Sequence, residues 1–149
     1  MNTLVIGYGN CLRGDDGAGP FVAGQVGEGA IACHQLTPEL AEPISQAHRV
    51  VFVDAHAGVP AGQIAIQPVA PRASAGIHRF DPEALLALSQ QLYGRAPEAI
   101  LIGIGGESFD LGEGLSPQAG CAARRALRAI RAFRNKLGGP FRGTMRLSQ

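Results

Sequence analysis

The fold of this protein is decided by residues 3–17, which read TLVIGYGNCLRGDDG. The apolar run from Thr3 to Ile6 predicts a buried strand. The glycines and Asn10 that follow predict a turn, because glycine adopts positive φ angles and lets the backbone approach other groups closely. Asp15 and Asp16 then stand where the next helix should begin. Each of these aspartates is interpreted either as a helix N-cap or as a carboxylate that a strand delivers to a cleft.

Length and composition indicate one globular domain. The chain has 149 residues, of which 46% are hydrophobic, and this is enough for a single layered core. Cys11, Cys33 and Cys121 form no CxxC pair, which favours a reduced, cytoplasmic protein over a disulfide scaffold or a zinc knuckle. No apolar run approaches the roughly 18 residues of a membrane span, and the opening strand lacks the basic region of a signal peptide. The formal charge of +1 favours neither nucleic acid nor an anionic membrane as a partner.

Strands and helices alternate along the chain. The expected strands cover residues 3–6, 31–35, 49–53, 62–69 and 99–104, and the expected helices cover residues 20–26, 38–47, 82–93 and 117–137. The polar and apolar alternation of residues 62–69 predicts a half-exposed edge strand, antiparallel to its neighbour. The whole pattern predicts an α/β fold, a three-layer α/β/α sandwich with a twisted, mainly parallel sheet of about five strands. We expect one domain over residues 1–137 and a flexible tail over 138–149.

Polar side chains follow several of the expected strands. Because parallel strands end at one edge of the sheet, where open α/β sheets bind ligands, we expect these side chains to lie close together. Asp16 follows the first strand, Asp54 and His56 follow the third, and Glu107 follows the last. His78 lies on a long loop that is free to reach the same edge. The sequence therefore predicts a cluster of carboxylates and imidazole.

Each of these candidates also has a purely structural interpretation. Adjacent aspartates at a helix start point about 100° apart, so they cannot both face one site. We assign the capping role to Asp15 and the site to Asp16. Aspartate is common in turns, so Asp54 taken alone fits a turn residue as well as a site carboxylate. The histidines and Glu107 are individually typical of loops and turns, and two histidines are interpreted as structural, namely His34 and His48.

The opening stretch also resembles a dinucleotide-binding turn. Leu12 takes the place of the third glycine in the G-x-G-x-x-G pattern. Two aspartates at the helix start would also repel a pyrophosphate, which needs the positive end of the helix dipole. The charges therefore favour a cation, and carboxylates with an imidazole suit a divalent metal such as Ni, Zn or Mn.

Six motifs in the chain form a recognisable series. They are GYGN-x-L-x-x-DDG-x-G at residues 7–19, QLTPEL at 35–40, VDA at 53–55, GIH at 76–78, ES at 107–108 and GLSP at 114–117. Together they resemble the hydrogenase maturation endopeptidases, over about residues 3–137. The QLTPEL segment is similar to the subgroup that serves bidirectional, NAD-linked nickel–iron hydrogenases.

This resemblance implies a cytoplasmic endopeptidase, and we expect it to be a monomer. Its substrate would be the hydrogenase large-subunit precursor, from which it removes a C-terminal extension once nickel has been inserted. The resemblance implies metal contacts through Asp16, Asp54 and His78. Our own hypothesis from the residues is that Asp16 or Asp54 activates the water that cuts the peptide bond, while nickel fixes the substrate beside them. The nickel would be carried by the substrate, and other divalent ions could substitute for it. Many members of the family have Glu at the position of Asp16.

Two other functions remain open from the sequence. Cys11 paired with His78 or His56 would make a thiol-dependent hydrolase, although the nearby aspartates disfavour a thiolate. A nickel-binding chaperone that holds the precursor without cutting it is the second alternative. Eight of the 13 Lys and Arg residues follow residue 123, and the basic face of the last expected helix could dock on an acidic surface of the large subunit. A solvated helix face is the simpler interpretation of these arginines, Arg124, Arg128, Arg131 and Arg134.

Overall fold

The computed structural model describes residues 2–73, 80–135 and 145–147. The six strands are β1 (Thr3–Tyr8), β2 (Ala30–Cys33), β3 (Arg49–Ala55), β4 (Ile64–Val69), β5 (Glu98–Ile104) and β6 (Met145–Leu147). The helices are α1 (Ala18–Val26), α2 (Ala41–Gln46), α3 (Pro82–Tyr93) and α4 (Pro117–Asn135), with short 3-10 helices η1 (Gly14–Gly17) and η2 (Pro38–Leu40). The elements expected from the sequence are all present, with ends shifted by a few residues.

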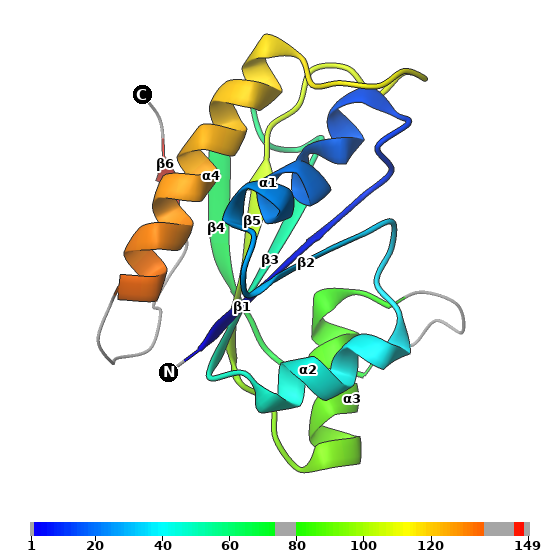
Figure 1. The fold of residues 1–149 in the computed structure, drawn as a ribbon, viewed down its shortest axis with the longest axis vertical. Coiled ribbons are helices and arrows are strands. Elements are labelled where there is room, and N and C mark those ends of the chain that lie inside the picture. Colours follow the sequence, from blue (N-terminus) through cyan, green and yellow to red (C-terminus); the bar gives the residue numbers. More distant parts are fainter. Residues whose placement is uncertain (1, 74–79, 136–144, 148–149) are drawn as a thin grey trace.

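The strands form one sheet in the order β2-β1-β3-β5-β4-β6 (Figure 1). β1, β2, β3 and β5 are parallel, whereas β4 runs antiparallel to both β5 and β6. The predicted α/β fold and the antiparallel direction of β4 are therefore confirmed. The prediction that β4 forms an edge is wrong, because Met145–Leu147 pair with Ile64–Ile66. These three residues belong to the tail for which the sequence predicted no regular structure.

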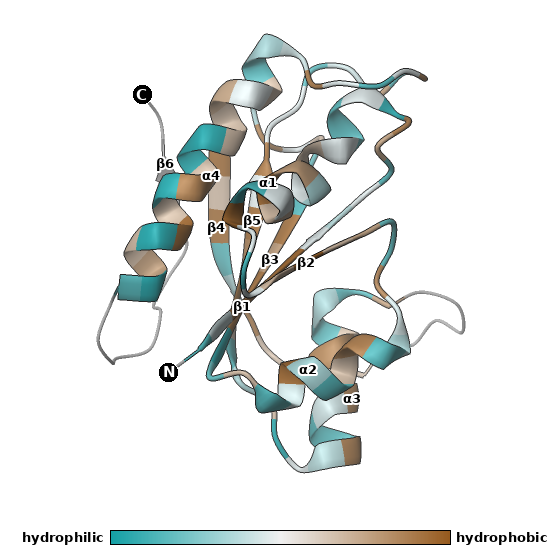
Figure 2. Cartoon of the chain, in the orientation of Figure 1, coloured by the Kyte–Doolittle hydropathy of each residue, from teal (hydrophilic) through white to brown (hydrophobic). Residues whose placement is uncertain are grey.

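Helices cover both faces of the sheet. One face packs against α1 and α4, and the opposite face packs against α2 and α3 (Figure 1). Figure 2 shows apolar residues along the central strands and two contrasting faces on α4. The apolar α4 residues Ala123, Ala126, Ile130 and Phe133 are buried, Leu127 is half-buried, and the arginines at 124, 128, 131 and 134 are exposed. No helix within the described ranges is both long and apolar enough to cross a membrane.

The sequence predicts helix N-caps at Thr37 and Asp81 and a helix stop at Gly94. The Asp81 side chain accepts a hydrogen bond of 2.8 Å from the backbone N–H of Ala84, and Gly94, with a φ of 75°, follows the last residue of α3. Both features agree with the sequence. The Thr37 side chain instead hydrogen-bonds with that of Glu39, and the chain there begins as η2. Leu92 is expected from its spacing to face the core, yet it is 59% exposed on the last turn of α3.

Two glycines let α1 pack closely against the sheet. A Cβ atom on Gly7 would lie 1.9 Å from the carbonyl oxygen of Gly19. A Cβ atom on Gly19 would lie 2.5 Å from the carbonyl oxygens of both Tyr8 and Val53. Only glycine fits this contact, and through it α1 sits directly on the ends of β1 and β3.

A pair of alanine substitutions within α1 tests this close packing. Gly19→Ala is expected to lower the free energy of unfolding by about 2–3 kcal/mol, because the new methyl group meets backbone atoms that cannot move aside. A Cβ atom on Gly24 would meet nothing within 4 Å, so Gly24→Ala should raise the free energy of unfolding by about 0.5–1 kcal/mol through better helix propensity. Urea unfolding measures both changes. Equal effects of the two substitutions would contradict the packing interpretation.

Candidate active site

Asp16 and Asp54 come together beside the carboxyl ends of the neighbouring strands β1 and β3. The strand that follows β1 in the chain, β2, lies on one side of the β1–β3 pair. The strands that follow β3, β4 and β5, lie on the other side, so strand order reverses between β1 and β3. This is where open α/β sheets bind their ligands. A cleft of about 430 Å³ opens there, lined by Tyr8, Gly9, Asp16, His34, Gln35, Leu36, Thr37, Pro38, Asp54 and Phe80. The sequence correctly placed both carboxylates at this edge.

The opening turn holds the Asp16 carboxylate in place. Its Oδ2 atom accepts a hydrogen bond of 2.7 Å from the backbone N–H of Asn10. The Asn10 side chain in turn accepts a bond of 2.9 Å from the N–H of Leu12, which stabilises the turn locally. Gly9 has a φ of 147°, and a Cβ on it would lie 2.0 Å from the carbonyl oxygen of Asp16. Glycine at this position therefore permits the approach of Asp16 to the end of β1.

Asp54 is a partly buried carboxylate beside a second negative charge. Burial, and then the charge of Asp16, raise the pKa of Asp54 to about 6. Hydrogen bonds from the Tyr8 hydroxyl and the Ala55 backbone oppose this shift. Burial, and then the negative charge of Asp54, raise the pKa of Tyr8. The Tyr8 hydroxyl therefore stays protonated and donates a hydrogen bond to Asp54. A carboxylate with a pKa near 6 is well matched to general base chemistry near neutral pH.

Asp15 does not cap α1, and the prediction of that role is wrong. Its side chain is fully buried, and the residue before α1 is Gly17. Its Oδ2 atom accepts hydrogen bonds from the backbone N–H groups of Glu107 (2.7 Å) and Ser108 (2.9 Å) and from the Ser116 hydroxyl (2.7 Å). Its Oδ1 atom accepts a bond of 2.7 Å from the backbone N–H of Ser116. Asp15 therefore connects the opening turn to the loop between β5 and α4.

The hydrogen bonds to Asp15 decide its ionisation. Burial by itself would raise its pKa, but the donors from Ser108, Glu107 and Ser116 outweigh burial and hold the pKa below its ordinary value. The Ser116 hydroxyl also accepts a bond of 3.1 Å from the N–H of Ala119, in the first turn of α4. A buried carboxylate with four hydrogen-bond donors is stable as an anion. Asp15 thereby holds together the opening turn, residues 107–108 after β5, and Ser116 at the start of α4.

Other members of the predicted cluster lie outside the cleft. His56 is exposed, and its Nδ1 atom accepts a hydrogen bond of 3.0 Å from the N–H of Gly58, which makes it a turn residue. The Glu107 side chain is exposed, and only its backbone N–H serves the site, through Asp15. Cys11 is exposed and lines two neighbouring hollows instead of the carboxylate cleft.

The third predicted metal contact, His78, lies outside the described residues. Phe80, two positions later, lines the carboxylate cleft. Within residues 2–73, 80–135 and 145–147, no three His, Cys, Asp or Glu side chains are placed to hold a metal ion together. The described part of the site thus supplies two carboxylates, which are ligand types that suit a divalent cation.

Two residues of the cleft were missed by sequence reasoning. The sequence favours a structural role for His34, yet this side chain is exposed and lines the cleft. Its position directly after a strand was a usable signal, the same one that identified Asp54. Tyr8 reaches Asp54 because Gly7 and Val53 are paired in register, which places the next residues of β1 and β3 side by side. That neighbour relation depends on strand order and has no local sequence signal.

Comparison with known proteins identifies the fold. No family model and no curated protein sequence matches the chain. Among solved structures, the NiFe hydrogenase maturation protease HybD from Thermococcus kodakarensis is 21% identical with a TM-score of 0.71, over 91% of this chain and 100% of that one. The maturation protease HycI from Thermococcus kodakarensis KOD1 is 24% identical with a TM-score of 0.69, over 91% and 93% of the two chains. The hydrogenase maturating endopeptidase HybD from E. coli is 19% identical with a TM-score of 0.65, over 89% and 91%.

Proposed function

We propose that this chain, which has the fold of hydrogenase maturation proteases, is an endopeptidase that removes the C-terminal extension from a nickel-loaded hydrogenase large-subunit precursor. The observation that carries the proposal is the meeting of Asp16 and Asp54 in one cleft at the switch point of this fold. The QLTPEL segment on which the sequence resemblance partly rests also lines that cleft, from Gln35 to Pro38. A fold, a cleft and a motif thus support the same activity.

The two carboxylates suggest a hydrolytic mechanism. Asp54 accepts a proton from water as the hydroxyl oxygen adds to the scissile carbonyl carbon. Asp54 then gives this proton to the amide nitrogen as the C–N bond breaks, so the amine leaves neutral and Asp54 ends as it began. The Tyr8 hydroxyl orients Asp54 by its hydrogen bond, and the Asn10 N–H orients Asp16.

Nickel enters this proposal as cargo of the substrate. Carboxylate oxygens and an imidazole nitrogen are suitable contacts for such an ion, and His78, close in sequence to Phe80 of the cleft, is the proposed third contact. A precursor without nickel would lack these contacts, so cleavage would be selective for the loaded form. The three free thiols in the described part of the chain are consistent with the reducing cytoplasm that the proposal requires. We also propose that the protein acts as a monomer.

Intact-mass spectrometry of the precursor tests the proposed function. The purified protein should remove the C-terminal peptide from nickel-loaded precursor and leave unloaded precursor at its full mass. Binding without any change in mass would identify a chaperone and contradict the proposal. Cys11→Ala should retain the kcat of cleavage at saturating precursor within about twofold, because the Cys11 thiol lies outside the carboxylate cleft. Loss of processing in this variant would instead favour the thiol-dependent hydrolase.

A further inference from the structure

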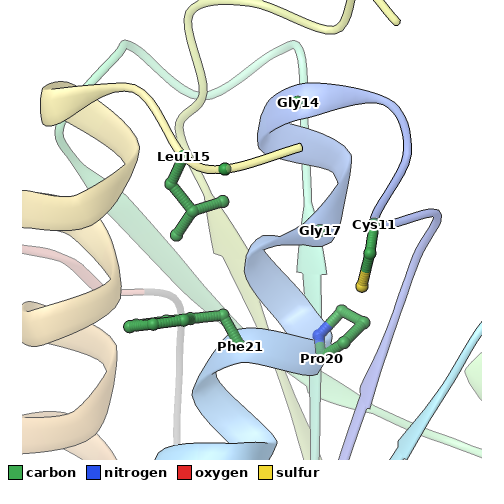
Figure 3. Close-up of a pocket in the computed structure, with 7 residues that line it drawn as sticks. Cys11, Gly14, Gly17, Pro20, Phe21 and Leu115 are labelled. Carbon is green, nitrogen blue, oxygen red and sulfur yellow. The ribbon is translucent and has the colours of Figure 1, made fainter. Parts of the chain in front are cut away.

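The carboxylate cleft continues into two further hollows. The second has a volume of about 400 Å³ and shares Gly9 and His34 with the cleft. The third has a volume of about 270 Å³ and shares Cys11 and Pro20 with the second (Figure 3). The three hollows therefore adjoin one another in a series that starts at the carboxylates. We call the second and third hollows together the apolar groove, lined by residues 9–12, 14, 17, 20, 21, 32–34, 114 and 115.

Large apolar side chains are exposed along this groove. Leu12 is 58% exposed and Phe21 is 43% exposed. Figure 3 shows Phe21 and Leu115 at one end of the groove, and the Cys11 sulfur directed towards Pro20. Exposed apolar side chains of this kind, gathered beside a polar cleft, are typical of a surface that a partner covers.

One wall of the groove is the free edge of the sheet. Within the described part of the chain, β2 pairs with β1 and with no other strand. The carbonyl groups of Gly29 and Cys33 accept hydrogen bonds from the backbone N–H groups of Val5 and Gly9, at 3.0 and 3.1 Å. Peptide groups alternate in direction along a strand, so those of Ala32 point away from β1, and Ala32 is exposed in the second hollow. An extended peptide can add to such an edge through main-chain hydrogen bonds.

We propose that the precursor segment next to the scissile bond lies extended along the apolar groove, with its backbone beside Ala32 and its apolar side chains against Leu12 and Phe21. This rests on the proposed function, because continuity with the Asp16–Asp54 cleft is what makes the occupant the substrate. A small molecule would fill one hollow, whereas an extended chain spans several in series. The groove therefore contributes sequence selectivity, and the carboxylate cleft contributes cleavage.

Charge substitutions in the groove test the side-chain contacts. Leu12→Glu and Phe21→Glu should each weaken the binding of nickel-loaded precursor by about tenfold or more, with a matching loss in kcat/KM, because each buries a charge under the bound chain. The kcat at saturating precursor should stay within about twofold. Leu92→Glu is the matched control, since Leu92 is 59% exposed on α3 and does not line the groove. Unchanged binding by both groove variants would overturn the proposal.

Backbone pairing at β2 has its own test. Ala32→Pro removes the outward N–H, a change that an edge strand tolerates, and should weaken precursor binding by about fivefold. Ala32→Ser keeps the N–H and serves as the control, and circular dichroism confirms the fold of both. If the wild type cuts the precursor but no groove variant binds more weakly, the groove proposal fails and the proposed function stands. If the wild type binds without cutting and the groove variants bind more weakly, the groove is supported and the proposed function fails.

Discussion

Asp15→Asn is expected to lower the free energy of unfolding by about 3 kcal/mol, although the substitution replaces only one carboxylate oxygen with an NH₂ group. Both carboxylate oxygens of Asp15 accept hydrogen bonds in the folded protein. Asparagine must place its NH₂ group at one of the two positions, where it faces another donor. Urea unfolding measures the loss. The hydrogen bonds lower the pKa of Asp15 from its ordinary value of 3.8, so the ionised carboxylate stabilises the fold at pH values above 3.8. The difference in unfolding free energy between wild type and variant should therefore shrink as the pH falls below 3.8.

Asp110→Asn provides the control for this prediction. Asp110 is an exposed aspartate in the same loop between β5 and α4, so its substitution should change stability by less than about 0.5 kcal/mol. Asp15→Asn should also lower the rate of cleavage by more than the fraction of unfolded protein accounts for. The reason is that η1 carries Asp16 as well as Asp15. Equal stability of the two variants would mean that the hydrogen bonds of Asp15 do not order the opening turn.

Asp54→Asn is expected to lose about 10³-fold in cleavage and, at the same time, to become more stable at alkaline pH. The pKa of Asp54 is raised from 3.8 to about 6, so the folded state holds this proton more tightly than the unfolded state does. The resulting stabilisation is complete below about pH 4 and is lost as the pH rises through 6. Asparagine has no charge to bury, so the variant should gain about 1–2 kcal/mol at pH 8, after allowance for partial solvent screening.

Two measurements check the Asp54 prediction. Urea unfolding at pH 8 and at pH 4 should show the gain at the higher pH and little difference at the lower one. The wild-type kcat/KM should fall below about pH 6 as Asp54 becomes protonated and can no longer act as a base. Retained cleavage by Asp54→Asn would reject the carboxylate mechanism. Reduced stability at pH 8 would instead reject burial and the Asp16 charge as the cause of the pKa shift.

Much of the fold could be predicted because its signals are local. The apolar run of β3, the amphipathic pattern of α4 and the cap at Asp81 each depend on residues a few positions apart. Alternation of these elements then leaves few possible topologies. The rule that parallel strands end at one edge was enough to bring Asp16 and Asp54 together in prediction.

The sequence by itself determined the layered fold, the antiparallel β4 and the pair of carboxylates, since periodicity and short-range capping energies act within a segment. Only the tertiary structure decided the role of Asp15. The hydrogen-bond partners of Asp15 lie 92 to 101 residues away in the chain. The residues next to Asp15 therefore do not show whether its carboxylate connects distant segments or caps a helix. The same holds for the Tyr8 contact with Asp54, the pairing of β6 with β4 and the groove beside β2. Each depends on which strands become neighbours, and that is settled by burying both faces of the sheet at once.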